Sequence, residues 1–98
     1  MSVYMIIEIT VHDAEMYSKY IVQAKEIILK YGGRYHVRGG EIRPMFGGWR
    51  PERLIVIEFD SFETVERCFK SEEYLAIAHL RENSTESRAV VVEKYESV

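Results

Sequence analysis

Four polar side chains occupy strand-like segments at positions where a buried strand is normally apolar. Glu8 lies in the run VYMIIEITV, Glu58 lies in LIVIEF, and His36 and Arg38 alternate in RYHVR. A charge on a strand face needs a partner, water or a function. A carboxylate, an imidazole and a guanidinium around one half-buried cavity are suited to proton transfer. In that interpretation Glu58 or Glu8 is the acid or base, His36 assists, and Arg38 stabilises an oxyanion.

The same residues also have a structural interpretation. Arg38 and Glu58 would then form an ion pair, and Glu8 would reach solvent at the end of the sheet. A single histidine on a strand, such as His36, is often a hydrogen-bonded packing residue. Both interpretations require Arg38 and Glu58 to share a sheet face, and His36 and Arg38 have the two-residue spacing that places them on one face.

Hydrophobic periodicity predicts the elements that position these side chains. Asp13 is the expected N-cap of a long helix that Gly32 ends. The expected strands cover residues 3–11, 34–46, 54–59 and 88–95, with a bend at Gly39-Gly40, and the expected helices cover residues 14–31, 61–69 and 71–82. The order β-α-β-β-α-β predicts one ferredoxin-like α+β domain over residues 1–98, with a four-stranded antiparallel sheet and helices on one face.

Both faces of the predicted sheet are apolar. The alternation assigns Met5, Ile7, Ile9, Ile55, Ile57 and Phe59 to the helix-covered face, and Tyr4, Ile6, Leu54 and Val56 to the other. An exposed apolar sheet face is typical of a partner site, and a second copy of the chain is the simplest partner. The sequence therefore predicts a homodimer through the sheet face. The first and third strands are neighbours in this topology, so Glu8 and Glu58 are expected to be close.

The segment from Gly32 to Arg88 also carries a specific pattern, GGR…VRGGE…W-x-PERL-x-x-IEF…S-x-EY…R…SR. It resembles a widespread family of small uncharacterised proteins in the dimeric α+β barrel group. The resemblance implies two ferredoxin-like protomers whose sheets form one barrel, with a pocket between sheet and long helix. Relatives with this barrel include cofactor-free monooxygenases of aromatic polyketide pathways, muconolactone isomerases, haem-dependent enzymes and ligand-sensing domains. The family itself has no assigned reaction, and a shared fold is analogy only.

A second set of candidates surrounds the loop GGWRPER. Trp49 is suited to stack on an aromatic ligand, and Arg53 is suited to bind its carboxylate. The alternative is that Trp49 closes the barrel end or lies in the dimer interface. On the long helix, the hydroxyl of Tyr17 or Tyr20 is a candidate to face a cleft, although the apolar stripe is otherwise core.

Composition excludes several functions. A net charge of −3 without a basic block argues against nucleic acid and anionic membranes as partners, and no apolar run approaches the ~20 residues that span a bilayer. Cys68 is the only cysteine, which favours a reducing, cytoplasmic location and an inert core thiol. His12, His36 and His79 lack the spacing of metal ligands, and no phosphate-binding glycine loop is present. Neither a metal nor a cofactor is expected.

The sequence therefore predicts a homodimer that binds or converts a small organic molecule, aromatic molecules included, without a cofactor. Whether the protein is an enzyme stays open. The alternative is a non-catalytic metabolite-binding protein, or an interaction scaffold whose barrel interior is filled.

Overall fold

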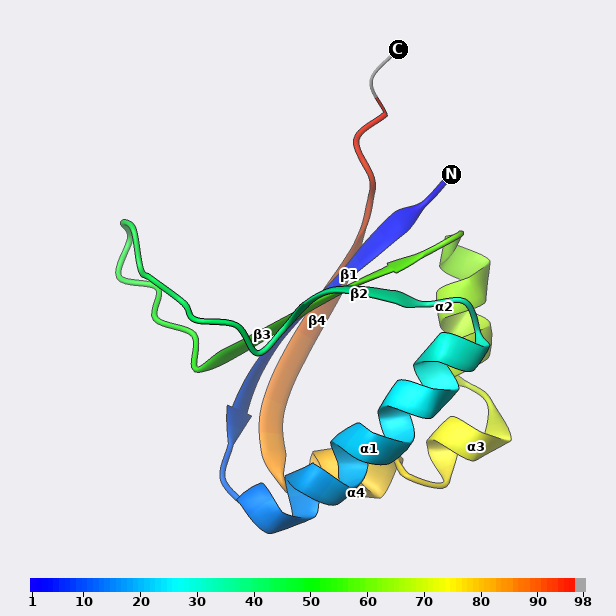
Figure 1. Cartoon of the computed structure of the whole chain (residues 1–98), viewed down its shortest axis with the longest axis horizontal. Helices are drawn as coiled ribbons and strands as arrows, with labels where there is room; N and C mark the ends of the chain where they lie inside the picture. The colour runs from blue at the N-terminus through cyan, green and yellow to red at the C-terminus, as the bar shows by residue number, and fades with distance from the viewer. Residues whose placement is uncertain (97–98) are drawn as a thin grey trace.

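A computed structural model describes residues 1–96 as one four-stranded antiparallel sheet with helices on one side (Figure 1). The strands are β1 (Val3–Val11), β2 (Arg34–Arg38), β3 (Arg53–Phe59) and β4 (Thr85–Glu93), and the helices are α1 (Ala14–Lys30), α2 (Phe62–Phe69), α3 (Glu72–Leu75) and α4 (Ala78–Glu82). The strand order in the sheet is β2-β3-β1-β4. The ferredoxin-like α+β prediction is confirmed, including the pairing of the first and third strands.

Local signals set the ends of the main helices. The Asp13 side chain accepts a hydrogen bond from the backbone N–H of Met16, and Ser61 accepts one from Thr64 in the same way at the start of α2. Gly32, with φ of +83°, lies just beyond the end of α1 in the left-handed region that glycine adopts without strain. These caps lie where the sequence predicts them.

The core lies between α1 and the helix-covered face of the sheet. The buried side chains of α1 are Tyr17, Tyr20, Ala24 and Ile28, and they face Val3, Ile9, Ile55, Ile57 and Phe59 of the sheet. Truncating a fully buried phenylalanine such as Phe59 typically destabilises a domain by about 3–5 kcal/mol. The predicted division of β1 and β3 into two faces is confirmed.

Three predicted elements differ from those of the structure. The second strand ends at Arg38, and residues 39–52 form a long loop that projects from the body of the molecule (Figure 1). The segment 71–82 is two short helices rather than one. The last strand begins at Thr85, earlier than expected, because the carbonyl of buried Ser84 accepts hydrogen bonds from His12 and Asp13 and aligns Thr85 with Val11.

A β-bulge in β2 changes which side chains face the helices. Tyr35 pairs with Ile57, but the next pairs are Val37 with Val56 and Arg38 with Ile55, so His36 is the extra residue. Cross-strand partners share a face. Tyr35 and Arg38 therefore lie on the helix side, like Ile57 and Ile55. The prediction that His36 and Arg38 share a face is wrong, because the bulge interrupts the two-residue alternation.

The other side of the sheet, which we call the outer face, carries no helix of the described chain. Register places Tyr4, Ile6, Leu54, Val56, Val90 and Val92 on this face. Val90 is 61% exposed and Val92 is 47% exposed. Among the helices of residues 1–96, none has the length and apolar character that crossing a bilayer requires.

Candidate functional site

The predicted cluster of Glu8, Glu58, His36 and Arg38 does not form. In the β1–β3 pairing Glu58 is opposite Tyr4, whereas Glu8 is opposite Leu54. The two carboxylates share the outer face but are four strand positions apart, about 13 Å at roughly 3.3 Å per residue. The expectation that they are close is therefore wrong, and each belongs to its own cluster.

Glu58 is the centre of an ion-pair cluster on the outer face. Its Oε1 is 2.8 Å from Nε2 of His36, and its Oε2 is 3.4 Å from both Nζ of Lys94 and Nη2 of Arg34. The hydrogen bond with His36 is the main cause that lowers the pKa of Glu58 to about 2. Arg38 is not among its partners, so the predicted Arg38–Glu58 pair is wrong. A nearly buried carboxylate with three partners and so low a pKa is a poor general base.

Glu8 is held by two donors at the other end of the outer face. Arg88 Nε lies 2.6 Å from Oε1, and Trp49 Nε1 donates to Oε2 at 3.2 Å. The hydrogen bond from Arg88 is the larger cause of a lowered pKa for Glu8. These three side chains, with Ile6, Leu54, Ala89 and Val90, line an open recess of about 280 Å³. Trp49 is thus placed on the outer face.

Arg53 and Tyr17 contact each other instead of a ligand cavity. Arg53 Nε donates to the Tyr17 hydroxyl at 2.9 Å, and its guanidinium carbon lies 5.6 Å from the centre of the Tyr17 ring. The guanidinium also packs against Gly39, whose φ is +79° and at which any side chain would collide with Arg53. The base of the long loop is thereby fixed to α1.

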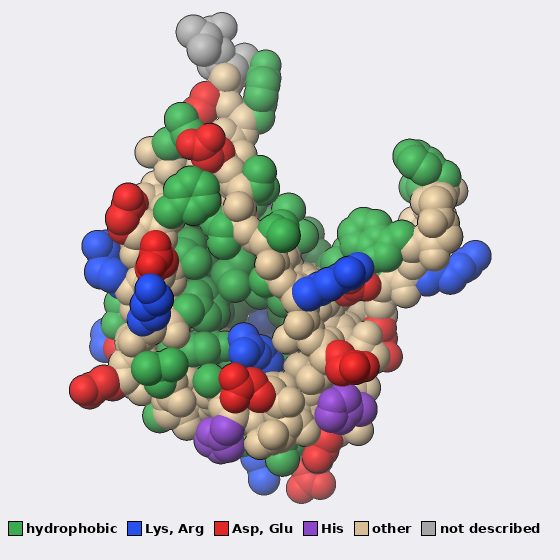
Figure 2. Space-filling model, turned by 180° about the vertical axis from the view of Figure 1, so that it is seen from behind, with side chains coloured by type: hydrophobic (Ala, Val, Ile, Leu, Met, Phe, Trp, Pro, Cys, Tyr) green, Lys and Arg blue, Asp and Glu red, His purple; other side chains and the backbone are tan. Residues whose placement is uncertain are grey.

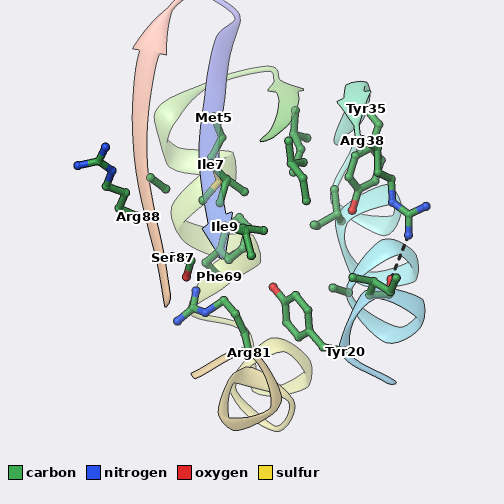
Figure 3. Close-up of a pocket in the computed structure, with 16 residues that line it drawn as sticks. Met5, Ile7, Ile9, Tyr20, Tyr35, Arg38, Phe69, Arg81, Ser87 and Arg88 are labelled. Carbon is green, nitrogen blue, oxygen red and sulfur yellow. Dashed lines mark hydrogen bonds between the residues drawn. The ribbon is translucent and has the colours of Figure 1, made fainter. Parts of the chain in front are cut away.

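A cavity of about 130 Å³ lies between α1 and the helix-covered face of the sheet (Figure 3). Its apolar lining comprises Met5, Ile7, Ile9, Ile21, Ala24, Ile28, Ile55, Ile57, Phe69 and Ala89, and its polar lining comprises Tyr20, Tyr35, Arg38, Arg81, Ser87 and Arg88. From behind, Figure 2 shows a hollow lined by hydrophobic side chains with a cationic side chain at its lower edge. Of the candidate residues named from the sequence, Arg38 and Tyr20 line this cavity.

Arg38 lies at one end of the cavity and Arg81 at the other (Figure 3). Arg38 Nη2 is 3.5 Å from the carbonyl oxygen of Ile21, and its guanidinium carbon lies 5.4 Å from the centre of the Tyr35 ring. Arg81 Nη1 donates to the Tyr74 hydroxyl at 3.2 Å, and that hydroxyl is 2.8 Å from the hydroxyl of Tyr20. Burial is the main cause that raises the pKa values of Tyr20, Tyr35 and Tyr74, so all three hydroxyls keep their protons at neutral pH.

The cavity lining determines what chemistry it supports. Within the described residues its polar groups are hydroxyls and guanidinium groups, and neither a carboxylate nor an imidazole takes part. Hydroxyls and guanidinium groups hold and orient a molecule, whereas proton abstraction near neutral pH needs a base. The arrangement therefore favours binding of a mainly apolar molecule.

Sequence reasoning identified part of this lining. Tyr20 was a candidate because it lies on the apolar stripe of α1. Arg38 was assigned to the wrong partner because the bulge at His36 was not foreseen, and Tyr35 was not among the candidates. Arg81 carries no spacing signal of its own, and only the packing of α4 against α1 brings it to the cavity.

The chain belongs to the family DUF1330, a domain of unknown function, whose model matches residues 2–95. No curated protein sequence matches the chain. Several solved structures share its fold. A protein of unknown function from Rhodopseudomonas palustris, RPA0582, has a TM-score of 0.84 at 14% identity, over 98% of this chain and 84% of that one.

Two further structures carry descriptions of function or assembly. SnoaB, a cofactor-independent oxygenase from Streptomyces nogalater, has a TM-score of 0.70 at 11% identity, over 99% of this chain and 96% of that one. A dimeric protein of unknown function with a ferredoxin-like fold from Bacteroides fragilis has a TM-score of 0.57 at 19% identity, over 95% of this chain and 96% of that one. At these identities the likeness shows the fold alone.

Proposed function

We propose that this member of a family of unknown function binds a small, mainly apolar organic molecule in the cavity between α1 and the sheet. The observation that supports this most directly is the cavity itself, which is lined by apolar side chains with hydroxyls and guanidinium groups at its ends. Binding pockets are typically apolar clefts with a few polar groups that fix orientation. A scaffold with a filled interior would leave no such space.

The cavity volume limits the size of the ligand. An engineered cavity of about 150 Å³ in another protein admits benzene, so a cavity of about 130 Å³ suits a ligand of roughly one ring. Arg81, at one end of the cavity, is placed to receive a polar group of the ligand (Figure 3). Aromatic and alicyclic molecules of this size are therefore the class to test.

Binding is favoured over catalysis by the position of the ionisable groups. SnoaB is described as a cofactor-independent oxygenase, and a reaction of that kind in this chain would need a base that contacts the substrate. The carboxylates of Glu58 and Glu8 and the imidazole of His36 lie on the outer face, away from the cavity. We therefore propose a metabolite-binding protein and assign Glu58 and His36 a structural role.

The protein is further proposed to be a homodimer of one-domain subunits through the outer face. That face exposes Val90 and Val92 beside Ile6 and Val56, and burying such side chains is favourable by about 25 cal/mol per Å² of apolar surface. The structurally similar protein from Bacteroides fragilis is described as dimeric. A lone buried thiol, Cys68, suits a reducing cytoplasm.

A thermal-shift screen against small aromatic acids, lactones and hydroxyquinones tests the proposed binding. A ligand at 100 times its Kd should stabilise the folded state by about 2.7 kcal/mol. The variant Ile7→Phe, which narrows the cavity, should lose the response, whereas Trp49→Ala, on the outer face, should keep it. A response lost only in Trp49→Ala would move the site to the recess beside Glu8. Unchanged melting with every compound would contradict binding of this class and favour an interaction scaffold that binds no small molecule.

A further inference from the structure

The charges at the cavity are all of one sign. Its charged lining residues are Arg38, Arg81 and Arg88, in a chain whose net charge is −3. Arg88 is neutralised on the outer face by Glu8, at 2.6 Å. Within residues 1–96, Arg38 has no carboxylate oxygen within 4.0 Å. The cavity therefore holds cationic groups that the described chain does not fully pair.

The guanidinium of Arg81 is only partly satisfied within the described chain. Nη1 is engaged by the Tyr74 hydroxyl, while Nε is shielded from solvent and has no hydrogen-bond partner among the described residues. Nη2 forms an ion pair with Oε2 of the exposed Glu82 at 3.6 Å, which is longer than a hydrogen bond. Nε and Nη2 form the side of the guanidinium that donates two parallel hydrogen bonds to a carboxylate. A buried donor without a partner is unfavourable, so a partner is expected at this edge.

Two hydroxyls lie near the same end of the cavity. Ser87 and Tyr20 line the cavity together with Arg81, and in Figure 3 the hydroxyl end of Tyr20 points toward the space between helix and sheet. Because the Tyr74 hydroxyl accepts a hydrogen bond from Arg81, it is free to donate its own proton to Tyr20. The proton of Tyr20 is then available to an acceptor in the cavity. The cavity lining thus offers a guanidinium and two hydroxyls as donors.

We propose that the ligand is a small monocarboxylate with an apolar body of about one ring. Its carboxylate binds the guanidinium of Arg81, with Ser87 and Tyr20 as additional donors, and its body lies among Ile9, Ile57 and Phe69. This inference rests on the proposed binding function and narrows it to one chemical class. A planar two-oxygen group fits a single guanidinium edge better than a tetrahedral phosphate, which would also take more of a cavity of about 130 Å³.

Calorimetric titration with benzoate and with benzyl alcohol at pH 7 tests the inference, because the two probes share a ring and differ in charge. Hydrogen bonds to a charged group typically change affinity by about tenfold or more. We expect benzoate to bind at least about tenfold more tightly than benzyl alcohol. Arg81→Met, which keeps the apolar stem but removes the charge, should abolish this preference and leave benzyl alcohol binding in place. Arg67→Met, at an exposed arginine of α2, is the control that should keep it.

The outcomes separate the two proposals. Equal affinities for both probes, or a benzoate preference that survives Arg81→Met, would overturn the carboxylate inference while leaving the cavity as a binding site. Binding of neither probe would overturn the inference together with the proposed function for one-ring ligands. Circular dichroism melts verify that Arg81→Met folds. If it does not fold, Ser87→Ala replaces it, and it should weaken benzoate binding several-fold without changing that of benzyl alcohol.

Discussion

Replacing Ala24 by leucine should stabilise the protein and remove its small-molecule binding. Ala24 is 2% exposed on α1, and it lines a cavity of about 130 Å³. At about 24 cal/mol per Å³, an empty cavity of that size costs about 3 kcal/mol relative to a filled interior. Leucine adds three carbon atoms at about 0.8 kcal/mol each, so the gain is at most about 2.4 kcal/mol. Packing strain should reduce the net gain to about 1–2 kcal/mol.

Thermal and urea melts measure this gain. For a domain of this size, each kcal/mol corresponds to a rise in Tm of about 4–8 °C. Ala14→Leu, at the exposed first residue of α1, is the control for helix propensity and should change stability by about 0.5 kcal/mol or less. The same samples are then titrated with benzoate, which should bind the wild-type protein and the control only.

Two results would refute this reasoning. A loss of stability of about 1 kcal/mol or more in Ala24→Leu would mean that the space beside α1 cannot accept the added carbon atoms. A stabilised variant that still binds benzoate with wild-type affinity would place the ligand elsewhere, with the recess beside Trp49 as the next candidate.

Three further predictions concern the outer face and the core. The pKa of Glu58 is lowered to about 2 from its ordinary value of 4.5, so its ion pairs stabilise the fold above pH 4.5 and are lost as the pH falls toward 2. The variant Glu58→Gln should therefore show a smaller loss of stability than the wild type between pH 4.5 and pH 2. Parallel curves of stability against pH for the two proteins would contradict this prediction. Burial raises the pKa of the Cys68 thiol to about 11, so a disulfide reagent should label this thiol only after denaturation. Rapid labelling of the native protein would contradict this prediction. In sedimentation experiments, Val90→Asp should convert the proposed dimer to a monomer. Val22→Asp, at an exposed position of α1, is the control and should leave the dimer intact. If the Val90→Asp variant remains dimeric, the outer face is excluded as the interface.

The fold was largely predictable because its signals are local. The alternation in β1 and β3, the cap at Asp13 and the glycine after α1 each depend on a few neighbouring residues. The ends of β2 and β4 depend instead on distant partners. Strand β2 stops where the chain leaves β3, and β4 begins where Ser84 meets the turn after β1. Sequence periodicity carries no information about such partners.

The candidate site was predicted less well for a related reason. One extra residue at His36 moves Arg38 to the helix side of the sheet, away from Glu58. The residue types were sound indicators of charge clusters, since both Glu8 and Glu58 form ion pairs. Their partners are set by strand register and by the loop that carries Trp49, which a single sequence does not specify.

The contact between Gly39 and Arg53 has a consequence for the evolution of this family. A side chain at position 39 would occupy the space of the Arg53 guanidinium, and that guanidinium in turn donates to Tyr17. A lineage that loses the glycine must therefore shorten the side chain at position 53 or release it from the helix. Substitutions at these positions are expected to occur together, and an alignment of family members should show positions 39 and 53 changing as a correlated pair.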